Sequence, residues 1–201
     1  MTIKPIKDWG HIFLDSSVII NLILSLKDGA TDPVALFTNK LITYLNDSNT
    51  GSEQRRQFYV SSITISEILS KVDTGERPKA IINAINSENV TFVAFDNQIA
   101  ELINDSYHSI LGTTLLNSFA RELSWPSHDL VLAREWITKD TMILASSQYL
   151  ECDVALTLDK KTMYKVAKKL AVPCALTFPD YFDASEKFII GYHHDKAMAN
   201  N

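Results

Sequence analysis

The sequence predicts an α/β protein, a three-layer α/β/α sandwich with a central, mainly parallel sheet. Short apolar runs typical of buried strands alternate with stretches in which apolar residues recur at helical spacing. The strand-like runs are apolar throughout, which is typical of a parallel sheet covered by helices on both faces. The chain has 201 residues, of which 46% are hydrophobic and 21% charged. This is an ordinary globular composition, and a domain of this length needs no disulfide to fold.

The first half of the chain contains three predicted strands. A strand at 12–14 ends at Asp15, and apolar residues then recur at helical spacing from Val18 to Leu26. Pro33 can open a helix that extends to about residue 46, because proline suits the first helical position. The polar segment 47–57 follows as a loop. The remaining predicted elements of this half are a strand at 58–60, a helix at 63–72 and a strand at 90–95.

The second half alternates in the same way. Asp96 is a predicted N-cap, and residues 105–139 predict further helices, interrupted at 125–127. Asp140 is predicted to open a helix that leads into a strand ending at Asp159. A lysine-rich helix to about residue 170 and a short strand at 174–177 complete the predicted sheet.

Charge, cysteine content and the N-terminus narrow the class of protein. The net charge of −5 has the wrong sign for a protein that coats nucleic acid, although an enzyme can hold one strand through a local basic patch. Cys152 and Cys174 are too few for a disulfide framework and indicate buried thiols in a reducing compartment. Residues 1–8 lack the apolar core expected of a signal peptide, and the uncharged stretch 16–26 is shorter than the roughly 20 residues of a membrane span. We therefore expect a cytoplasmic protein with no membrane association.

Four acidic residues lie where a parallel sheet would bring them together. Asp15 and Asp159 each follow a predicted strand, Glu67 lies early in the helix after the second strand, and Asp140 precedes the fourth strand. Ligands of such sheets bind beyond the carboxyl ends of the strands. Clustered carboxylates stay ionised together only if a cation compensates their charge, and an all-oxygen site suits Mg²⁺ or Mn²⁺. Sites of this kind typically hydrolyse phosphodiesters.

Each acid also has a structural interpretation. Asp15 and Asp140 could cap the helices that follow them, Glu67 could be a partly exposed helix residue, and Asp159 could be a turn residue. Asp129 competes with Asp140 as the third acid, but the helix of Asp140 leads directly into the next strand. Only the joint placement of the four acids favours the functional interpretation.

Four motifs together show a resemblance to a known family. They are Ile12-Phe-Leu-Asp15-Ser-Ser17-Val18, Ser62-Ile-Thr-Ile-Ser-Glu67-Ile68, Lys139-Asp140-Thr-Met-Ile-Leu-Ala145 and Leu156-Thr157-Leu-Asp159. This order resembles the PIN-domain nucleases, the family that includes the VapC toxins. The resemblance covers about residues 12–177 and implies a single PIN-like domain over 1–182 with a C-terminal tail at 183–201. Relative to the compact toxins, extra helices are inserted at about 28–57 and 105–139.

The resemblance implies a metal-dependent endoribonuclease that hydrolyses single-stranded RNA. Its catalytic and metal-binding carboxylates would be Asp15, Glu67, Asp140 and Asp159, holding one or two Mg²⁺ or Mn²⁺ ions. The hydroxyls of Ser17 and Thr157 would orient a carboxylate or a metal-bound water. The family also implies a possible role as the toxin of a toxin–antitoxin pair, with an antitoxin protein as partner.

Basic residues near the acids are candidate RNA contacts. Lys160 and Lys161 follow the last acid directly, where many PIN-domain proteins carry a further acid. A solvated helix face is the structural alternative, whereas a phosphate contact would offset the repulsion between a net-acidic nuclease and its substrate. Arg55 and Arg56, before the second strand, are weaker candidates.

Two further expectations concern function and assembly. The main alternative to a nuclease is a catalytically inert PIN-like module that binds RNA or protein, and the complete set of four acids argues against it. We expect a homodimer, because the apolar helices at 18–26 and 105–139 exceed what one modest sheet needs to be covered.

Overall fold

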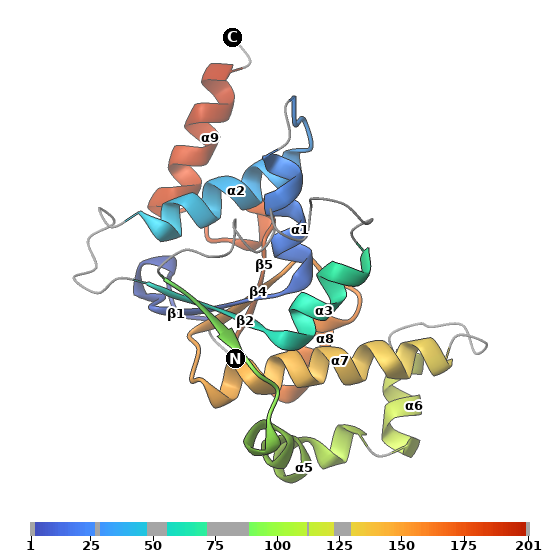
Figure 1. Ribbon diagram of the computed structural model, residues 1–201. Coiled ribbons are helices and arrows are strands. Elements are labelled where there is room, and N and C mark those ends of the chain that lie inside the picture. Colours follow the sequence, from blue (N-terminus) through green and yellow to red (C-terminus); the bar gives the residue numbers. More distant parts are fainter. Residues whose placement is uncertain are drawn as a thin grey trace.

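A five-stranded parallel sheet forms the centre of the computed structural model, which describes residues 3–26, 29–47, 56–71, 89–111, 113–122 and 130–199. The strand order is β3-β2-β1-β4-β5, and every neighbouring pair is parallel. The strands are β1 (His11–Leu14), β2 (Gln57–Ser61), β3 (Val90–Val93), β4 (Val154–Thr157) and β5 (Cys174–Leu176). The predicted three-layer α/β/α sandwich is confirmed (Figure 1).

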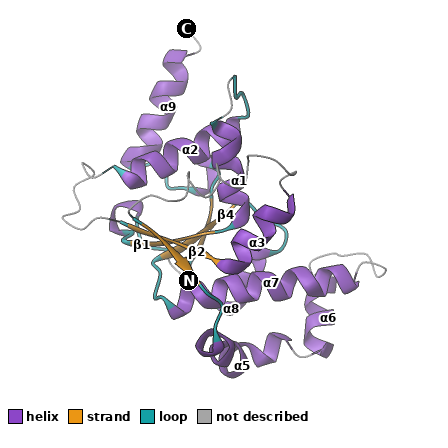
Figure 2. Cartoon of the chain, in the orientation of Figure 1, coloured by secondary structure: helices purple, strands orange, loops and turns teal. Residues whose placement is uncertain are grey.

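Helices cover both faces of the sheet, as Figure 2 shows. One face is covered by α1 (Ser16–Ser25), α2 (Pro33–Asn46) and α9 (Lys187–Ala199). The other is covered by α6 (Thr113–Glu122), α7 (Leu130–Tyr149) and α8 (Met163–Leu170), with α5 (Asn97–Leu111) packed against α7. The short 3₁₀ helices η1 (Ile6–Asp8) and η4 (Pro179–Tyr181) complete the described elements. No helix in the described ranges is both long and apolar enough to cross a bilayer.

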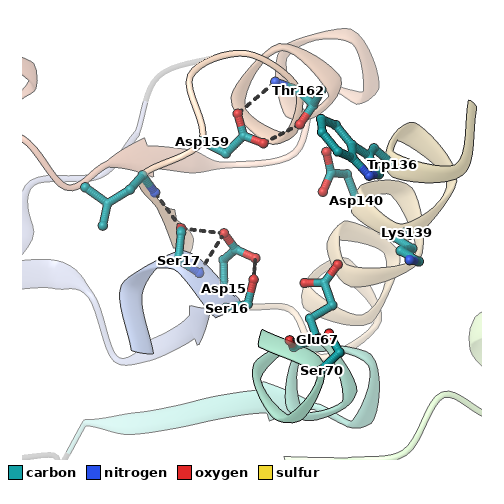
Figure 3. Close-up of a pocket in the computed structure, with 11 residues that line it drawn as sticks. Asp15, Ser16, Ser17, Glu67, Ser70, Trp136, Lys139, Asp140, Asp159 and Thr162 are labelled. Carbon is teal, nitrogen blue, oxygen red and sulfur yellow. Dashed lines mark hydrogen bonds between the residues drawn. The ribbon is translucent and has the colours of Figure 1, made fainter. Parts of the chain in front are cut away.

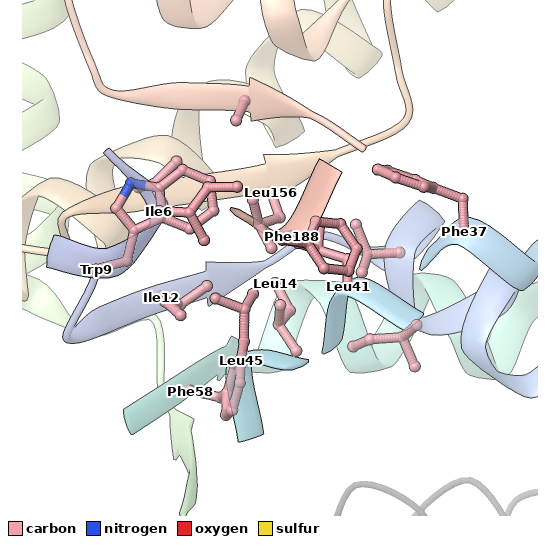
Figure 4. Close-up of a cluster of buried hydrophobic side chains, with 14 of the residues drawn as sticks. Ile6, Trp9, Ile12, Leu14, Phe37, Leu41, Leu45, Phe58, Leu156 and Phe188 are labelled. Carbon is pink, nitrogen blue, oxygen red and sulfur yellow. The ribbon is translucent and has the colours of Figure 1, made fainter. Parts of the chain in front are cut away.

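Alternating side chains of the buried strands divide the core into two layers. Ile12 and Leu14 of β1 belong to one apolar cluster, with α1, α2 and α9, whereas Phe13 belongs to the cluster on the opposite face. Figure 4 shows the first cluster, in which Phe37 of α2 lies against the rings of Phe182, Phe188 and Tyr192. Because side chains on both faces of β1 are buried, packing fixes which of its residues face each layer.

The strand order reverses between β1 and β4. The chain builds β1, β2 and β3 in one direction and then returns to add β4 and β5 on the other side of β1. The main chain of Asp15 is tied to β4, because its N–H donates to Leu156 O at 3.1 Å. In open parallel sheets a ligand crevice forms outside the carboxyl ends of the strands at such a reversal. The topology therefore places a crevice beside Asp15.

Helix α3 (Ser62–Lys71) lies at the rim of the sheet and contacts both α1 and α7 (Figure 1). Its Ile68 is fully buried in the first core cluster. This packing fixes which way α3 faces, and the preceding residue, Glu67, is half-buried beside it.

The prediction that Asp140 opens a helix is wrong. Asp140 lies inside α7, which runs without a break from Leu130 to Tyr149. Apolar residues on both sides of it, including Ile137 and Ile143, are fully buried, so packing outweighs the preference of aspartate for helix starts. The competing acid Asp129 and the predicted interruption at 125–127 lie outside the described residues.

The C-terminal segment contains a packed helix. The expected tail began at residue 183, and within that segment Lys187–Ala199 forms α9. Phe188, Ile189 and Tyr192 are buried in the first core cluster, where two of these rings contact Phe37.

The aromatic contacts of Phe37 predict a large stability loss on truncation. Phe37→Ala removes a fully buried ring and should lower the free energy of unfolding by about 3–5 kcal/mol. Urea unfolding followed by circular dichroism measures the loss. Leu26→Ala is the control, because Leu26 is 66% exposed and its truncation should cost little. Equal effects of the two substitutions would contradict the described packing of α2.

Candidate functional site

A cleft of about 410 Å³ opens at the carboxyl ends of β1 and β4 (Figure 3). All four acids singled out from the sequence line it, and each comes from a different part of the fold. Asp15 follows β1 and Asp159 lies just after β4. Glu67 lies on α3, and Asp140 lies inside α7. The cleft therefore gathers residues that are far apart in the sequence.

Asp15 is held by two hydroxyl groups. Its Oδ2 accepts hydrogen bonds from Ser17 Oγ at 2.6 Å and from Thr157 Oγ1 at 2.8 Å. Each hydroxyl oxygen also accepts a hydrogen bond from the main chain. The N–H of Leu158 donates to Ser17 Oγ at 2.9 Å, and the N–H of Asp159 donates to Thr157 Oγ1 at 3.0 Å. Because those N–H groups occupy the hydroxyl oxygens, the hydroxyl protons are directed at the carboxylate.

Asp15 also starts helix α1. Its side chain accepts a longer hydrogen bond from Ser17 N at 3.4 Å, so it caps the helix as well as lining the cleft. Its second oxygen, Oδ1, receives a 3.4 Å hydrogen bond from Ser16 Oγ. The capping and functional interpretations of this residue are therefore compatible.

Asp159 is fixed by the loop that follows it. Its Oδ1 accepts the main-chain N–H groups of Lys161 at 2.7 Å and Thr162 at 2.9 Å, and its Oδ2 accepts the hydroxyl of Thr162. These contacts close the turn before α8. The carboxylate thus has a structural role, while Asp159 and Thr162 also line the cleft.

Asp140 has no comparable support. Its Oδ2 is buried and has no hydrogen-bond partner among the described residues. Buried polar atoms in native proteins are almost always satisfied, and each exception calls for an explanation such as strain, a catalytic role, or a bound water or ion. Asp140 is thus the one acid of the four whose carboxylate is left with an orphaned oxygen in the described structure.

The surroundings of Asp140 disfavour its ionised form. Burial raises the pKa of Asp140 well above its ordinary value, and the negative charge of Asp15 adds to the increase. The hydroxyl of Thr162 lowers the pKa in part, whereas Asp159 and Glu67 raise it further. The main cause is therefore desolvation, followed by repulsion from the other carboxylates.

The donor set fits a hard divalent cation. The cleft offers four carboxylates, with no His or Cys among its lining residues, as Mg²⁺ and Mn²⁺ prefer. Among the described residues, however, no three such side chains already converge as a formed metal site. The carboxylates surround the cleft, and side-chain movement is needed to close a coordination sphere. The orphaned Oδ2 of Asp140 is the atom that a cation would satisfy.

The basic residues proposed from the sequence as RNA contacts differ in location and exposure. Lys160 and Lys161 are exposed next to Asp159 at the rim of the cleft. Arg56 is buried at the opposite end of the sheet, before β2, so its assignment as an RNA contact is wrong. Its guanidinium donates to the carbonyls of Trp9 at 2.9 Å and Leu45 at 3.2 Å. Arg55 lies outside the described residues.

The cleft also contains residues that the sequence analysis did not single out as part of the site. Trp136 and Lys139 line it from α7, and Trp136 is 45% exposed. Trp136 lies four residues before Asp140, so one helical face presents both. That spacing is informative only once α7 is known to continue through Asp140. Lys139 is paired with Glu135 at 2.9 Å, a hydrogen bond that raises the pKa of Lys139.

Comparisons with known proteins provide little beyond this geometry. No family model matches the sequence, and no curated protein does. A solved structure with a similar shape is the VapBC2 complex of Rickettsia felis bound to a DNA fragment from its promoter. The match has 10% sequence identity and a TM-score of 0.48, and covers 83% of this chain and 98% of the other. Similarity at this level does not assign a function.

The buried carboxylate of Asp140 predicts an unusual dependence of stability on pH. Because folding raises the pKa of Asp140, the free energy of unfolding of the cation-free protein should fall as the pH rises from about 3.8 through the raised pKa. Asp140→Asn removes this loss, and its amide can donate to a neighbouring carboxylate. We expect the variant to be more stable than wild type in EDTA at pH 7, by roughly 1–3 kcal/mol.

Chemical unfolding across the pH range measures this difference. Asp105→Asn serves as the control, because Asp105 is an exposed acid on α5. An Asp140→Asn variant that is less stable than wild type in EDTA would show that the carboxylate is stabilising without a cation.

Proposed function

We propose that this chain is an endoribonuclease that hydrolyses single-stranded RNA and uses Mg²⁺ or Mn²⁺ as its cofactor. The observation that carries the proposal is the buried, unpartnered Oδ2 of Asp140 in a cleft that three other carboxylates line. A buried carboxylate among like charges costs stability, and a bound cation would offset that cost. The motif resemblance to PIN-domain nucleases supports the same assignment.

The four acids have different parts in this proposal. Asp140 Oδ2 has no hydrogen-bond partner among the described residues, so it is the carboxylate oxygen left to meet a cation. Glu67, half-buried on α3, lines the same cleft. Asp15 and Asp159 provide carboxylates whose orientation is set by Ser17, Thr157 and the loop before α8. A bound divalent cation would supply Lewis-acid activation of water and charge stabilisation at the leaving oxygen.

RNA as substrate requires positive charge near an acidic cleft. Lys160 and Lys161 are exposed at its rim and can contact phosphates on either side of the scissile one. These contacts offset the repulsion between the carboxylates and the RNA backbone. Arg56 has no part in this interface.

We extend the proposal to partners. A role as a toxin implies an antitoxin protein that inhibits the enzyme. The homodimer expected from the sequence finds support in Leu24, Leu26 and Leu36, which are exposed apolar side chains on and near α1 and α2. Light scattering at micromolar concentration tests the dimer, and a monomer would refute it.

Cleavage of a panel of single-stranded and structured RNAs tests the enzyme. We expect the wild type to cut single-stranded substrates with Mg²⁺ or Mn²⁺ and to lose activity in EDTA. Asp140→Asn should lower the cleavage rate by more than about 100-fold, since even outer partners of metal ligands contribute 10- to 100-fold. Asp105→Asn should cleave like the wild type.

Two outcomes of this assay would contradict the proposal. Cleavage that persists in EDTA would exclude a role for a divalent cation. Wild-type protein that neither cleaves RNA nor binds Mn²⁺ in calorimetry would favour the inert PIN-like module.

Ser17 provides a separate test of how Asp15 is oriented. Ser17→Ala removes the 2.6 Å hydrogen bond to Asp15 Oδ2 and should weaken Mn²⁺ binding by about 10- to 100-fold in calorimetry. Ser25→Ala is a matched control on the same helix, because Ser25 Oγ donates to Leu22 O away from the cleft. Unchanged Mn²⁺ affinity in Ser17→Ala would show that this hydroxyl serves only the helix start.

A further inference from the structure

An exposed lysine at the rim of the cleft is held by aromatic rings rather than by acids. Lys160 directly follows Asp159, and its Nζ lies 4.6 Å from the centre of the Tyr181 ring and 5.5 Å from that of Phe178. No carboxylate in the described part of the chain forms an ion pair with it. The ammonium therefore keeps its positive charge available, even though four carboxylates line the neighbouring cleft.

The rings form a small surface beside the lysine. Phe178 and Tyr181 have centroids 6.1 Å apart, and Tyr164 of α8 meets Tyr181 edge-on at 6.2 Å. Tyr181 is nevertheless 44% exposed. Because Phe178 and Tyr164 both contact it, the Tyr181 ring is positioned while part of it stays exposed.

The same loop positions this surface relative to the acids. Asp159 Oδ1 accepts the N–H groups of Lys161 and Thr162, and Asp159 O accepts the N–H of Tyr164 at 3.0 Å. The main chain that carries Lys160 is therefore fixed by the acid that lines the cleft. A nucleic acid strand leaving the cleft past Asp159 would meet the ammonium and the rings together.

We propose that Lys160, Phe178 and Tyr181 form a subsite for one unpaired nucleotide next to the scissile phosphate. Lys160 binds the phosphate of this nucleotide, and the exposed part of Tyr181 stacks on its base, while Phe178 positions both. Aromatic rings stack on any unpaired base, and positive charge tracks the phosphates. The inference rests on the proposed nuclease function and gives a physical reason for its single-stranded substrate: the base at this subsite must be unpaired, because duplex bases have both faces covered.

Binding measurements on full-length Asp140→Asn protein test the subsite without cleavage. Fluorescence anisotropy compares a labelled single-stranded RNA with an abasic strand of the same length. Tyr181→Ala in this background should weaken binding of the RNA roughly 5- to 150-fold and leave the abasic strand nearly unaffected. Tyr181→Phe should bind both strands like the parent, since the ring rather than the hydroxyl makes the contact.

Lys160 has a different expected signature. Lys160→Gln should weaken binding of both strands and reduce the slope of log K against log salt concentration by about 0.7, the contribution of one phosphate contact on a single strand. Matched controls are Lys165→Gln, an exposed lysine on the same loop-to-helix segment, and Tyr149→Ala, a tyrosine of similar exposure at the end of α7. Both controls should bind like the parent.

The subsite and the nuclease can fail separately. Tyr181→Ala that binds RNA like the parent, or that weakens the RNA and the abasic strand equally, would overturn the subsite, as would a parent protein that binds neither strand. These results leave the cleavage assay of the wild type unaffected. Conversely, base-dependent binding through Tyr181 in a wild type that cleaves nothing would keep the subsite and overturn the nuclease.

Discussion

Repulsion between four carboxylates in one cleft is the constraint on which the site depends. The acids come from the ends of two strands and from two helices, so the whole sandwich contributes to holding them there. Because β1 packs between two apolar layers, Asp15 at its end is held in place at the cleft. Burial of Ile137 and Ile143 fixes the face of α7 that carries Asp140. Favourable packing of the apolar core thereby keeps the four carboxylates close together, although their mutual repulsion alone would push them apart.

The acids of the cleft differ in how much they contribute to the fold. Asp15 caps α1 and is held by two hydroxyls, and Asp159 closes the turn before α8. Both would be useful to the fold in a protein without any activity. Asp140 contributes nothing comparable, since its Oδ2 is buried without a partner in the described structure. In the proposed function, a bound cation would offset the cost of burying this carboxylate.

The sequence was sufficient to predict the sheet and the acids at its edge, because strands that are apolar throughout and carboxylates directly after them are local patterns. It misjudged α7, where a long-range effect, burial of apolar residues on both sides of Asp140, keeps the helix intact. Arg56 was misread for a similar reason: charge suggests exposure, but its carbonyl partners Trp9 and Leu45 are distant in the sequence. Trp136 joined the site only through the continuity of α7.

Anomalous diffraction from crystals grown with Mn²⁺ tests whether a cation binds at Asp140, because it locates the cation independently of any reaction. We expect an anomalous peak in the cleft within coordination distance of Asp140 Oδ2, and we expect it to be lost in crystals of Asp140→Asn. A well-ordered Asp140 with no peak beside it at saturating Mn²⁺, or a peak that survives the substitution unchanged, would show that Asp140 does not bind a cation.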